Sequence, residues 1–310
     1  MSGATKAAQK GGNTVQRHGV WTVLEHWAIA LSGLLLLFTG FGQMPMYSRY
    51  MVDRLPGLAW ASDYSVTFRI HLWAGAVFTA AVVFHVVRNL TEGGWAIWPR
   101  RGDVGASARI LWAILRRKPE PPSHKFLAEQ RLAYAFIGGV TLVLVVTGVL
   151  KVLKNLGTLQ LPYGVIVWNT LFHNVATVFF LLGFFAHLGA FVVKANRPLL
   201  RAMFTGRVRR AYALHRHPLW IEGGEDAGPA RRRLDVRDGA RLLQGTLGAT
   251  GLLLGAAVAP AWYALALVVV LSQMVTAFTG RCPLEASLRR LGFPAPAPVP
   301  IRSNRPTGSR

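Results

Sequence analysis

Histidines recur at one fixed spacing inside two long apolar stretches of this sequence. His71 and His85 lie in the stretch RIHLWAGAVFTAAVVFHVVRNL, and His173 and His187 lie in HNVATVFFLLGFFAH. A separation of fourteen residues is close to four full helical turns, so both rings of a pair leave one helix face, about 21 Å apart. Neutral imidazole is a common axial ligand of haem iron. Rings placed in this way suit two haems stacked across a membrane.

A plainer interpretation of one intramembrane histidine is a hydrogen bond to a neighbouring helix. The recurrence of the spacing favours ligands instead, and Gly183 and Gly189 leave room beside His187 for a bulky cofactor. The single cysteine, Cys282, excludes an intrachain disulfide and any cysteine-based zinc or iron–sulfur site. A metal cofactor would therefore be held by histidine.

Composition places these histidines in a membrane protein. The 310 residues are 52% hydrophobic, with a mean hydropathy of +0.33. Six apolar runs are long enough to cross a bilayer, since a helix of about 20 residues covers its hydrocarbon core. The predicted fold class is all-α and integral to the membrane, with spans at residues 21–41, 69–90, 132–152, 164–193, 242–259 and 261–279.

The basic residues set the orientation. Of the 35 lysines and arginines, 30 fall on one side of the six spans if both termini are cytoplasmic. This placement explains the net charge of +22 by attraction to anionic membrane lipid, so we expect no role in nucleic-acid binding. The first twenty residues contain no apolar core, which predicts no cleaved signal peptide.

With this topology, histidines at matching depths form two pairs. His71 and His173 each lie early in an inward-running helix and share the outer leaflet. His26, near the start of the first helix, shares the inner leaflet with His187. Each pair can hold one iron through imidazoles from two helices. His85 also lies on the inner side, and the residues alone leave open whether it replaces His26 opposite His187.

The order of motifs is specific. The chain contains EHWAIALSGLLLLFTG, RIHLWAG, KFLAEQRLAY with a later VTGVL, and HNVATVFFLLGFFAH followed by GRVRRAYALHRHPLW. Over about residues 17–220 it resembles the cytochrome b (gamma) subunit of respiratory formate dehydrogenases. The resemblance implies a four-helix bundle with two b haems, and the family's ligands fall on His26, His71, His173 and His187. His85 matches no ligand of that family.

The resemblance also implies a quinone, either menaquinone or ubiquinone, reduced near the inner haem. The segment that enters the third helix supplies Glu129, Gln130 and Arg131, polar groups able to hold a quinone carbonyl and to deliver protons. The family usually has an asparagine where this chain has Leu127. We predict a quinone site that includes Gln130 and Arg131, beside His187.

Four regions are predicted along the chain. Residues 1–220 form the dihaem cytochrome b domain, 221–241 a basic linker, 242–293 a two-helix membrane hairpin that ends in the Cys282–Pro283 motif, and 294–310 a disordered tail. The hairpin resembles small two-helix membrane domains of unknown role. An amphipathic piece at residues 106–118 is expected to lie on the membrane surface through Ile110, Leu111, Ile114 and Leu115.

The predicted function is electron transfer between a peripheral dehydrogenase and membrane quinone. The sequence holds no motif for a molybdenum site or an iron–sulfur cluster, so it is not a stand-alone dehydrogenase. The expected partners are an iron–sulfur subunit and a catalytic dehydrogenase subunit, in the bacterial inner membrane, and the resemblance favours formate as donor. The alternatives are the cytochrome b of a hydrogenase or of a thiosulfate-type reductase, and a haem-free anchor or transporter.

Overall fold

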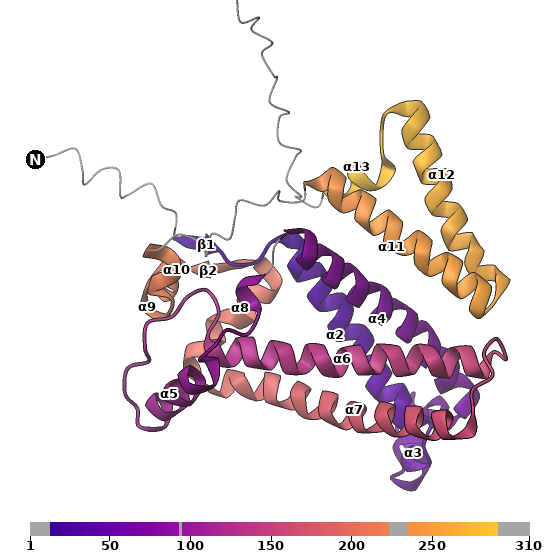
Figure 1. The fold of residues 1–310 in the computed structure, drawn as a ribbon, viewed down its shortest axis with the longest axis horizontal. Helices are drawn as coiled ribbons and strands as arrows, with labels where there is room; N and C mark the ends of the chain where they lie inside the picture. The colour runs from indigo at the N-terminus through magenta and orange to yellow at the C-terminus, as the bar shows by residue number, and fades with distance from the viewer. Residues whose placement is uncertain (1–12, 93–94, 223–234, 291–310) are drawn as a thin grey trace, which may run out of the picture.

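Helices make up most of the computed structural model, which describes residues 13–92, 95–222 and 235–290 (Figure 1). Two helical hairpins form its centre. One pairs α2 (Val20–Gly42) with α4 (Tyr64–Glu92), and the other pairs α6 (Ala128–Asn155) with α7 (Tyr163–Gly189). The second hairpin lies beside the first and crosses it at an angle (Figure 1). The first four predicted spans are thereby confirmed as helices.

The ends of these helices depend on short-range capping. α4 begins at Tyr64, five residues before the predicted start, because the Asp63 carboxylate accepts hydrogen bonds from the backbone N–H groups of Ser65 and Val66 at 2.8 and 3.1 Å. α6 begins at Ala128, where the side-chain oxygen of Gln130 accepts from the Leu127 N–H at 3.1 Å. Both caps lengthen helices whose centres the apolar pattern predicts.

One end of the bundle, which we call the α3 end, is closed by three short helices between α2 and α4. They are α3 (Met46–Arg49), η2 (Val52–Arg54) and η3 (Ala59–Ser62). This connection turns tightly onto α2, since a Cβ at Gly42 would lie 2.5 Å from the carbonyl oxygen of Ala61. Sequence reasoning predicted only an aromatic loop here.

The opposite end, the α8 end, carries a cap that sequence reasoning described only as a basic loop. After the 3₁₀ turns η5 (Ala190–Val192) and η6 (Lys194–Asn196), it contains α8 (Arg197–Thr205), α9 (Arg210–Arg216) and α10 (Pro218–Glu222). Strand β1 (Thr14–Gln16) pairs antiparallel with β2 (Arg207–Arg209). The pairing brings the N-terminal segment to the end of α7, and Ala202, Val208, Ala213 and Trp220 form the core of the cap.

Helix α5 (Asp103–Leu115) lies at the same end and corrects one expectation. Ile110 is buried against Leu127 and Ala128, with Ile114 packed beside it, so this face holds the start of α6. Leu111 and Leu115 lie on the exposed face. Only the face with the two leucines can meet a membrane surface, because the two isoleucines pack against the start of α6.

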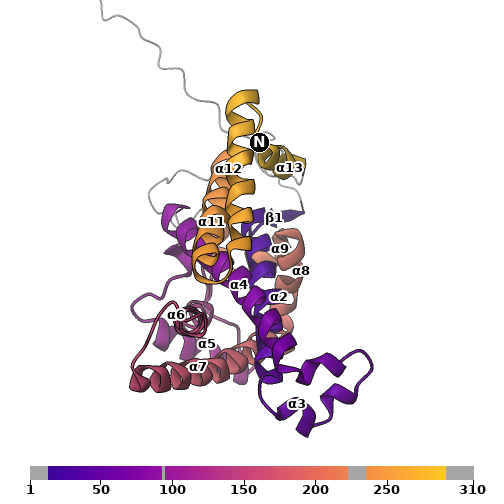
Figure 2. The ribbon, with the colours of Figure 1, turned by 90° about the vertical axis from the view of Figure 1, so that its right-hand side faces the viewer.

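The C-terminal hairpin comprises α11 (Val236–Ala257), η7 (Pro260–Trp262) and α12 (Tyr263–Thr279), followed by α13 (Pro283–Arg290). It packs against α4 (Figures 1 and 2), and its tip lies near the α6–α7 connection. At one end of the contact the rings of Trp73 and Trp262 lie 3.7 Å apart. At the other, Gly239 lies so close to Trp21 that a Cβ there would come within 2.3 Å of the indole ring.

Five helices in the described part of the chain are long and apolar enough to span a membrane, and α12, counted from Pro260, is the fifth. The predicted sixth span, residues 242–259, lies in α11, which is not among them. Arg241, Gln244 and several glycines and threonines lower its hydropathy. Most of the predicted basic linker and the tail at 294–310 lie outside the described residues.

Candidate functional site

At the α3 end, two histidines from different hairpins are held in the same way. The Nδ1 atom of His71 lies 3.0 Å from the hydroxyl oxygen of Thr39, and the Nδ1 atom of His173 lies 2.8 Å from that of Thr147. We call His71, His173 and their two threonines the threonine tier.

A glycine follows each of these threonines and lies beside the ring. A Cβ at Gly40 would lie 3.5 Å from Cε1 of His71, and a Cβ at Gly148 would lie 3.5 Å from Cε1 of His173. Both rings are only partly buried although they sit within membrane spans. The tier therefore combines imidazoles anchored by hydroxyl groups with ring surfaces that the described residues cover only in part.

Toward the α8 end, His26 of α2 faces His187 of α7. Their ring centroids are 6.2 Å apart, with an angle of 50° between the planes. A metal ion bound about 2 Å from a nitrogen of each ring would put the centroids about 6 Å apart, which matches the separation of these two rings. The sequence-predicted inner pair is brought together, and we call it the open pair.

His85 lies at a similar depth but in different surroundings. Its Nδ1 atom is 2.9 Å from a carboxylate oxygen of Glu25, and its Nε2 atom is 2.9 Å from the hydroxyl of Tyr134. Arg88 forms an ion pair with the same carboxylate, and its Nε donates to the other oxygen at 3.0 Å. Both ring nitrogens of His85 are occupied, which favours His26 as the partner of His187. We call this group the closed pair, after its central residues His85 and Tyr134.

The two hairpins repeat one pattern that the sequence interpretation did not detect. His26 precedes Thr39 by thirteen residues, as Tyr134 precedes Thr147. His71 and His173 each have a second histidine fourteen residues later and a phenylalanine seven residues later, and those two rings, Phe78 and Phe180, meet edge to face 6.1 Å apart. By this repeat Tyr134 is the equivalent of His26, and His85 is the equivalent of His187. Each residue of the closed pair thus corresponds to one residue of the open pair in the other half.

Gln130 and Arg131, the predicted quinone contacts, both take part in structural hydrogen bonds. Gln130 caps α6 through its side-chain oxygen. Arg131 is buried and donates from Nε to one Asp103 oxygen at 2.8 Å and from an Nη to the other at 2.5 Å. The Arg131 guanidinium holds the pKa of Asp103 below its usual range. These contacts tie α5 to the start of α6.

The cap at the α8 end buries ionisable groups. His217 is fully buried and donates from Nδ1 to the carbonyl oxygen of His124 at 2.7 Å. Burial, with the nearby charge of Arg17, lowers the pKa of His217 to about 4, and burial lowers the pKa of His18 to about 3. Both histidines are therefore neutral at pH 7.

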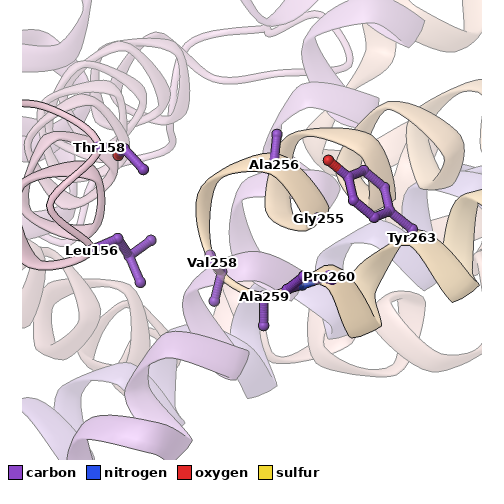
Figure 3. A pocket seen from close by; sticks show the side chains of 8 residues that line it. All are labelled: Leu156, Thr158, Gly255, Ala256, Val258, Ala259, Pro260 and Tyr263. Atoms are coloured by element: carbon purple, nitrogen blue, oxygen red, sulfur yellow. The ribbon is translucent and has the colours of Figure 1, made fainter.

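The clearest pockets lie away from the histidines. One, with a volume of about 350 Å³, lies where the tip of the C-terminal hairpin meets the α6–α7 connection, and it is lined by Leu156, Thr158 and Tyr263 among others (Figure 3). A second lies between Trp73 and the start of α12. Neither is lined by a histidine or a carboxylate, so neither is a candidate for the redox site.

In the described residues, no group of three or more His, Cys, Asp or Glu side chains could hold a bare metal ion. Two facing imidazoles instead suit a metal whose other ligands come from a macrocycle. Sequence reasoning found all the histidines of these pairs but missed Thr39, Thr147 and Tyr134. The repeated Thr-Gly dipeptide, before a histidine in each following helix, was the signal available for the threonines.

Comparison with known proteins agrees with this chemistry. A family model described as prokaryotic cytochrome b561 matches residues 17–206, which is more than half of the chain and includes all four helices of the two central hairpins. No curated protein gives a significant match.

Proposed function

The chain belongs to the prokaryotic cytochrome b561 family of membrane cytochromes b, and from this premise we propose that it carries electrons through two b haems between a peripheral dehydrogenase and membrane quinone. The observation that carries the proposal is the set of two histidine pairs on facing helices, above all His26 and His187 at 6.2 Å. His71 and His173 form the second ligand pair. When bound, a b haem supplies one-electron redox chemistry.

The work of the protein is to hold each pair at its own depth. α7 contributes one ligand to each pair, through His173 and His187, and the four central helices are all long enough to span the bilayer. In the most apolar stretch of α7, only 6% of the residues are buried inside the described structure. Much of its surface is therefore available to the lipid and to the two cofactors.

We place the α8 end in the cytoplasm because the basic segments of the sequence flank it. The exposed face of α5 supports this, since Leu111 and Leu115 are followed by Arg116 and Arg117, which suit an anionic membrane surface. In this orientation the threonine tier lies near the outer surface of the bacterial inner membrane. Lys151 and Lys154 lie at that end and are suited to docking an iron–sulfur partner.

The quinone site belongs, in this proposal, at the α8 end beside His187. Gln130 lies at the start of α6, at that end of the bundle. An electron that enters at the outer side and leaves at the inner side moves charge across the membrane, worth about 2.3 kcal/mol per 100 mV. Formate is the donor that the sequence resemblance favours. A hydrogenase or thiosulfate-type reductase is the alternative, and the identity of the copurifying subunit separates these cases.

The direct test is the reduced-minus-oxidised optical spectrum and haem content of the purified chain. We expect low-spin b-type bands and two haems per chain. A chain purified from haem-supplied cells without such bands would instead be a haem-free anchor or transporter. Replacing Gln130 by Leu tests the quinone site, since the haems should still be reduced while electron delivery to quinone falls. Unchanged quinone reduction in this variant would count against that location.

A further inference from the structure

The threonine tier differs from the open pair in one chemical respect. In the threonine tier each imidazole has a hydroxyl partner at Nδ1. Among the described residues, no hydroxyl hydrogen-bonds the ring of His26 or His187. The rings that these two histidines contact are each other's and those of Trp27 and Phe191. The two ligand pairs are therefore not equivalent.

The direction of the Thr–His hydrogen bond follows from the other contact of each hydroxyl. The Thr39 hydroxyl lies 2.7 Å from the carbonyl oxygen of Leu35, and the Thr147 hydroxyl lies 2.6 Å from that of Val143. A hydroxyl has one proton, and a carbonyl oxygen can only accept. The threonine thus donates to its own helix, as threonines within helices commonly do, and accepts from the imidazole.

This arrangement fixes the tautomer of the ring. Nδ1 must carry the proton of His71 and of His173, which leaves the lone pair on Nε2, the nitrogen that can bind iron. An acceptor at Nδ1–H also makes an imidazole a more basic ligand. A more basic ligand stabilises the ferric state over the ferrous state, so it lowers the reduction potential of the iron it binds.

Two features indicate that the hydrogen bond between threonine and histidine is a specific feature of the site. It occurs twice, in hairpins that share the Thr-Gly dipeptide and the fourteen-residue histidine spacing. Both threonines are also buried, so water does not compete for the hydroxyl.

We propose that Thr39 and Thr147 are positioning residues that fix the ligand tautomer at the threonine tier and lower the potential of its haem relative to that of the open pair. This inference rests on the proposed dihaem function and deepens it. Because electrons move spontaneously toward higher potential, the difference favours flow from the threonine tier to the α8 end. The hydroxyl groups of Thr39 and Thr147 would thus help to set the direction of electron flow.

The test is a redox titration of purified Thr147→Val, followed optically, with the haem content measured on the same sample. Valine keeps the shape of threonine and removes the acceptor. We choose Thr147 because the Leu36 carbonyl also interacts with the His71 ring and would remain in Thr39→Val. One of the two potentials should rise, by about threefold to tenfold in the ratio of reduced to oxidised haem at fixed potential, the range that one hydrogen bond provides.

Three further variants make the result decisive. Thr147→Ser keeps the hydroxyl and should restore the original potential. Thr246→Val removes a threonine of α11 that bonds its own helix in the same way, to the Leu242 carbonyl at 2.9 Å, and should change neither potential. In a His187→Ala background, where only the threonine-tier haem remains, the Thr147→Val shift should persist.

Unchanged potentials in Thr147→Val, or an equal shift in Thr147→Ser, would overturn the inference. If Thr147→Val instead loses one haem, retention of both haems in Thr147→Ser supports the positioning role, and loss in both variants refutes it. Failure of the proposed function is a separate result, since it would show as a wild-type chain without haem.

Discussion

The two hairpins of the central bundle carry matching side chains at one end of the bundle and different side chains at the other. At the α3 end the halves match, because each brings a histidine, a threonine and a glycine to the same arrangement. At the α8 end they diverge. The rings of the open pair, His26 and His187, face each other with centroids 6.2 Å apart, whereas His85 and Tyr134 at the equivalent positions are hydrogen-bonded to each other.

The divergence has an identifiable cause in two charged side chains. Glu25 and Arg88 form a buried ion pair that also engages His85. By the same offsets, the other half has Ala133 and Ala190 where these two residues stand. In the proposed function, ligands in one half thus stand where the other half has hydrogen-bonded structural side chains, and the presence of a histidine does not by itself identify a ligand.

The largest effect is expected from removing both histidines of α7, which in the proposed function supplies one ligand to the threonine tier and one to the open pair. His173→Ala combined with His187→Ala should reduce the haem content from two per chain to none, and each single variant should lose one. A pyridine haemochrome assay gives the count. Phe172→Ala, beside His173 on the exposed surface, is the matched control and should keep both haems. Retention of both haems in His173→Ala would show that the threonine tier holds no haem through His173.

A large effect on stability is expected at the closed pair. Arg88→Met leaves the buried Glu25 carboxylate without its arginine and should cost about 3–5 kcal/mol. Arg289→Met breaks an exposed pair with Glu285 at 2.7 Å and should cost less than about 1 kcal/mol. Thermal unfolding of the two variants in the same detergent compares them. Equal losses would mean that the closed pair has no structural role.

Acid should weaken the α8 end through His217. Its pKa in the folded chain is about 4, below the usual 6.5, so the unfolded chain binds the proton first. The stabilisation is complete above pH 6.5 and is lost as the pH falls from 6.5 toward 4, by up to about 1.4 kcal/mol per pH unit. Unfolding temperatures at pH 7 and pH 5 measure the loss. His217→Asn should show a smaller difference, and an unchanged pH dependence would contradict the assignment.

The smallest effect is expected outside both tiers. Cys282 packs in the contact between the C-terminal hairpin and the start of α2, where Gln244 Nε2 donates to its sulfur at 3.8 Å. Cys282→Ser should therefore leave both haems and quinone reduction unchanged. A fall in quinone reduction with intact haems would link the hairpin to electron transfer.

Much of this architecture is predictable from sequence, because the length of the apolar runs and the spacing of the histidines are visible without any knowledge of tertiary contacts. The four central helices follow from the length of the apolar runs, and the depths of the histidines predict that His71 pairs with His173. The status of His85 does not, since its partners Glu25 and Tyr134 lie on other helices and only packing brings them together. The cap at the α8 end was missed because β1 and β2 are three residues each and pair across most of the chain.

The most direct test of the account compares the haem content of His26→Ala with that of His85→Ala. The open pair predicts one haem per chain in His26→Ala, and the closed pair predicts two in His85→Ala. His85→Gln can preserve hydrogen bonds to Glu25 and Tyr134, so it should also keep two haems if the alanine variant folds poorly. Two haems in His26→Ala together with one in both His85 variants would contradict the account and make His85 the ligand opposite His187.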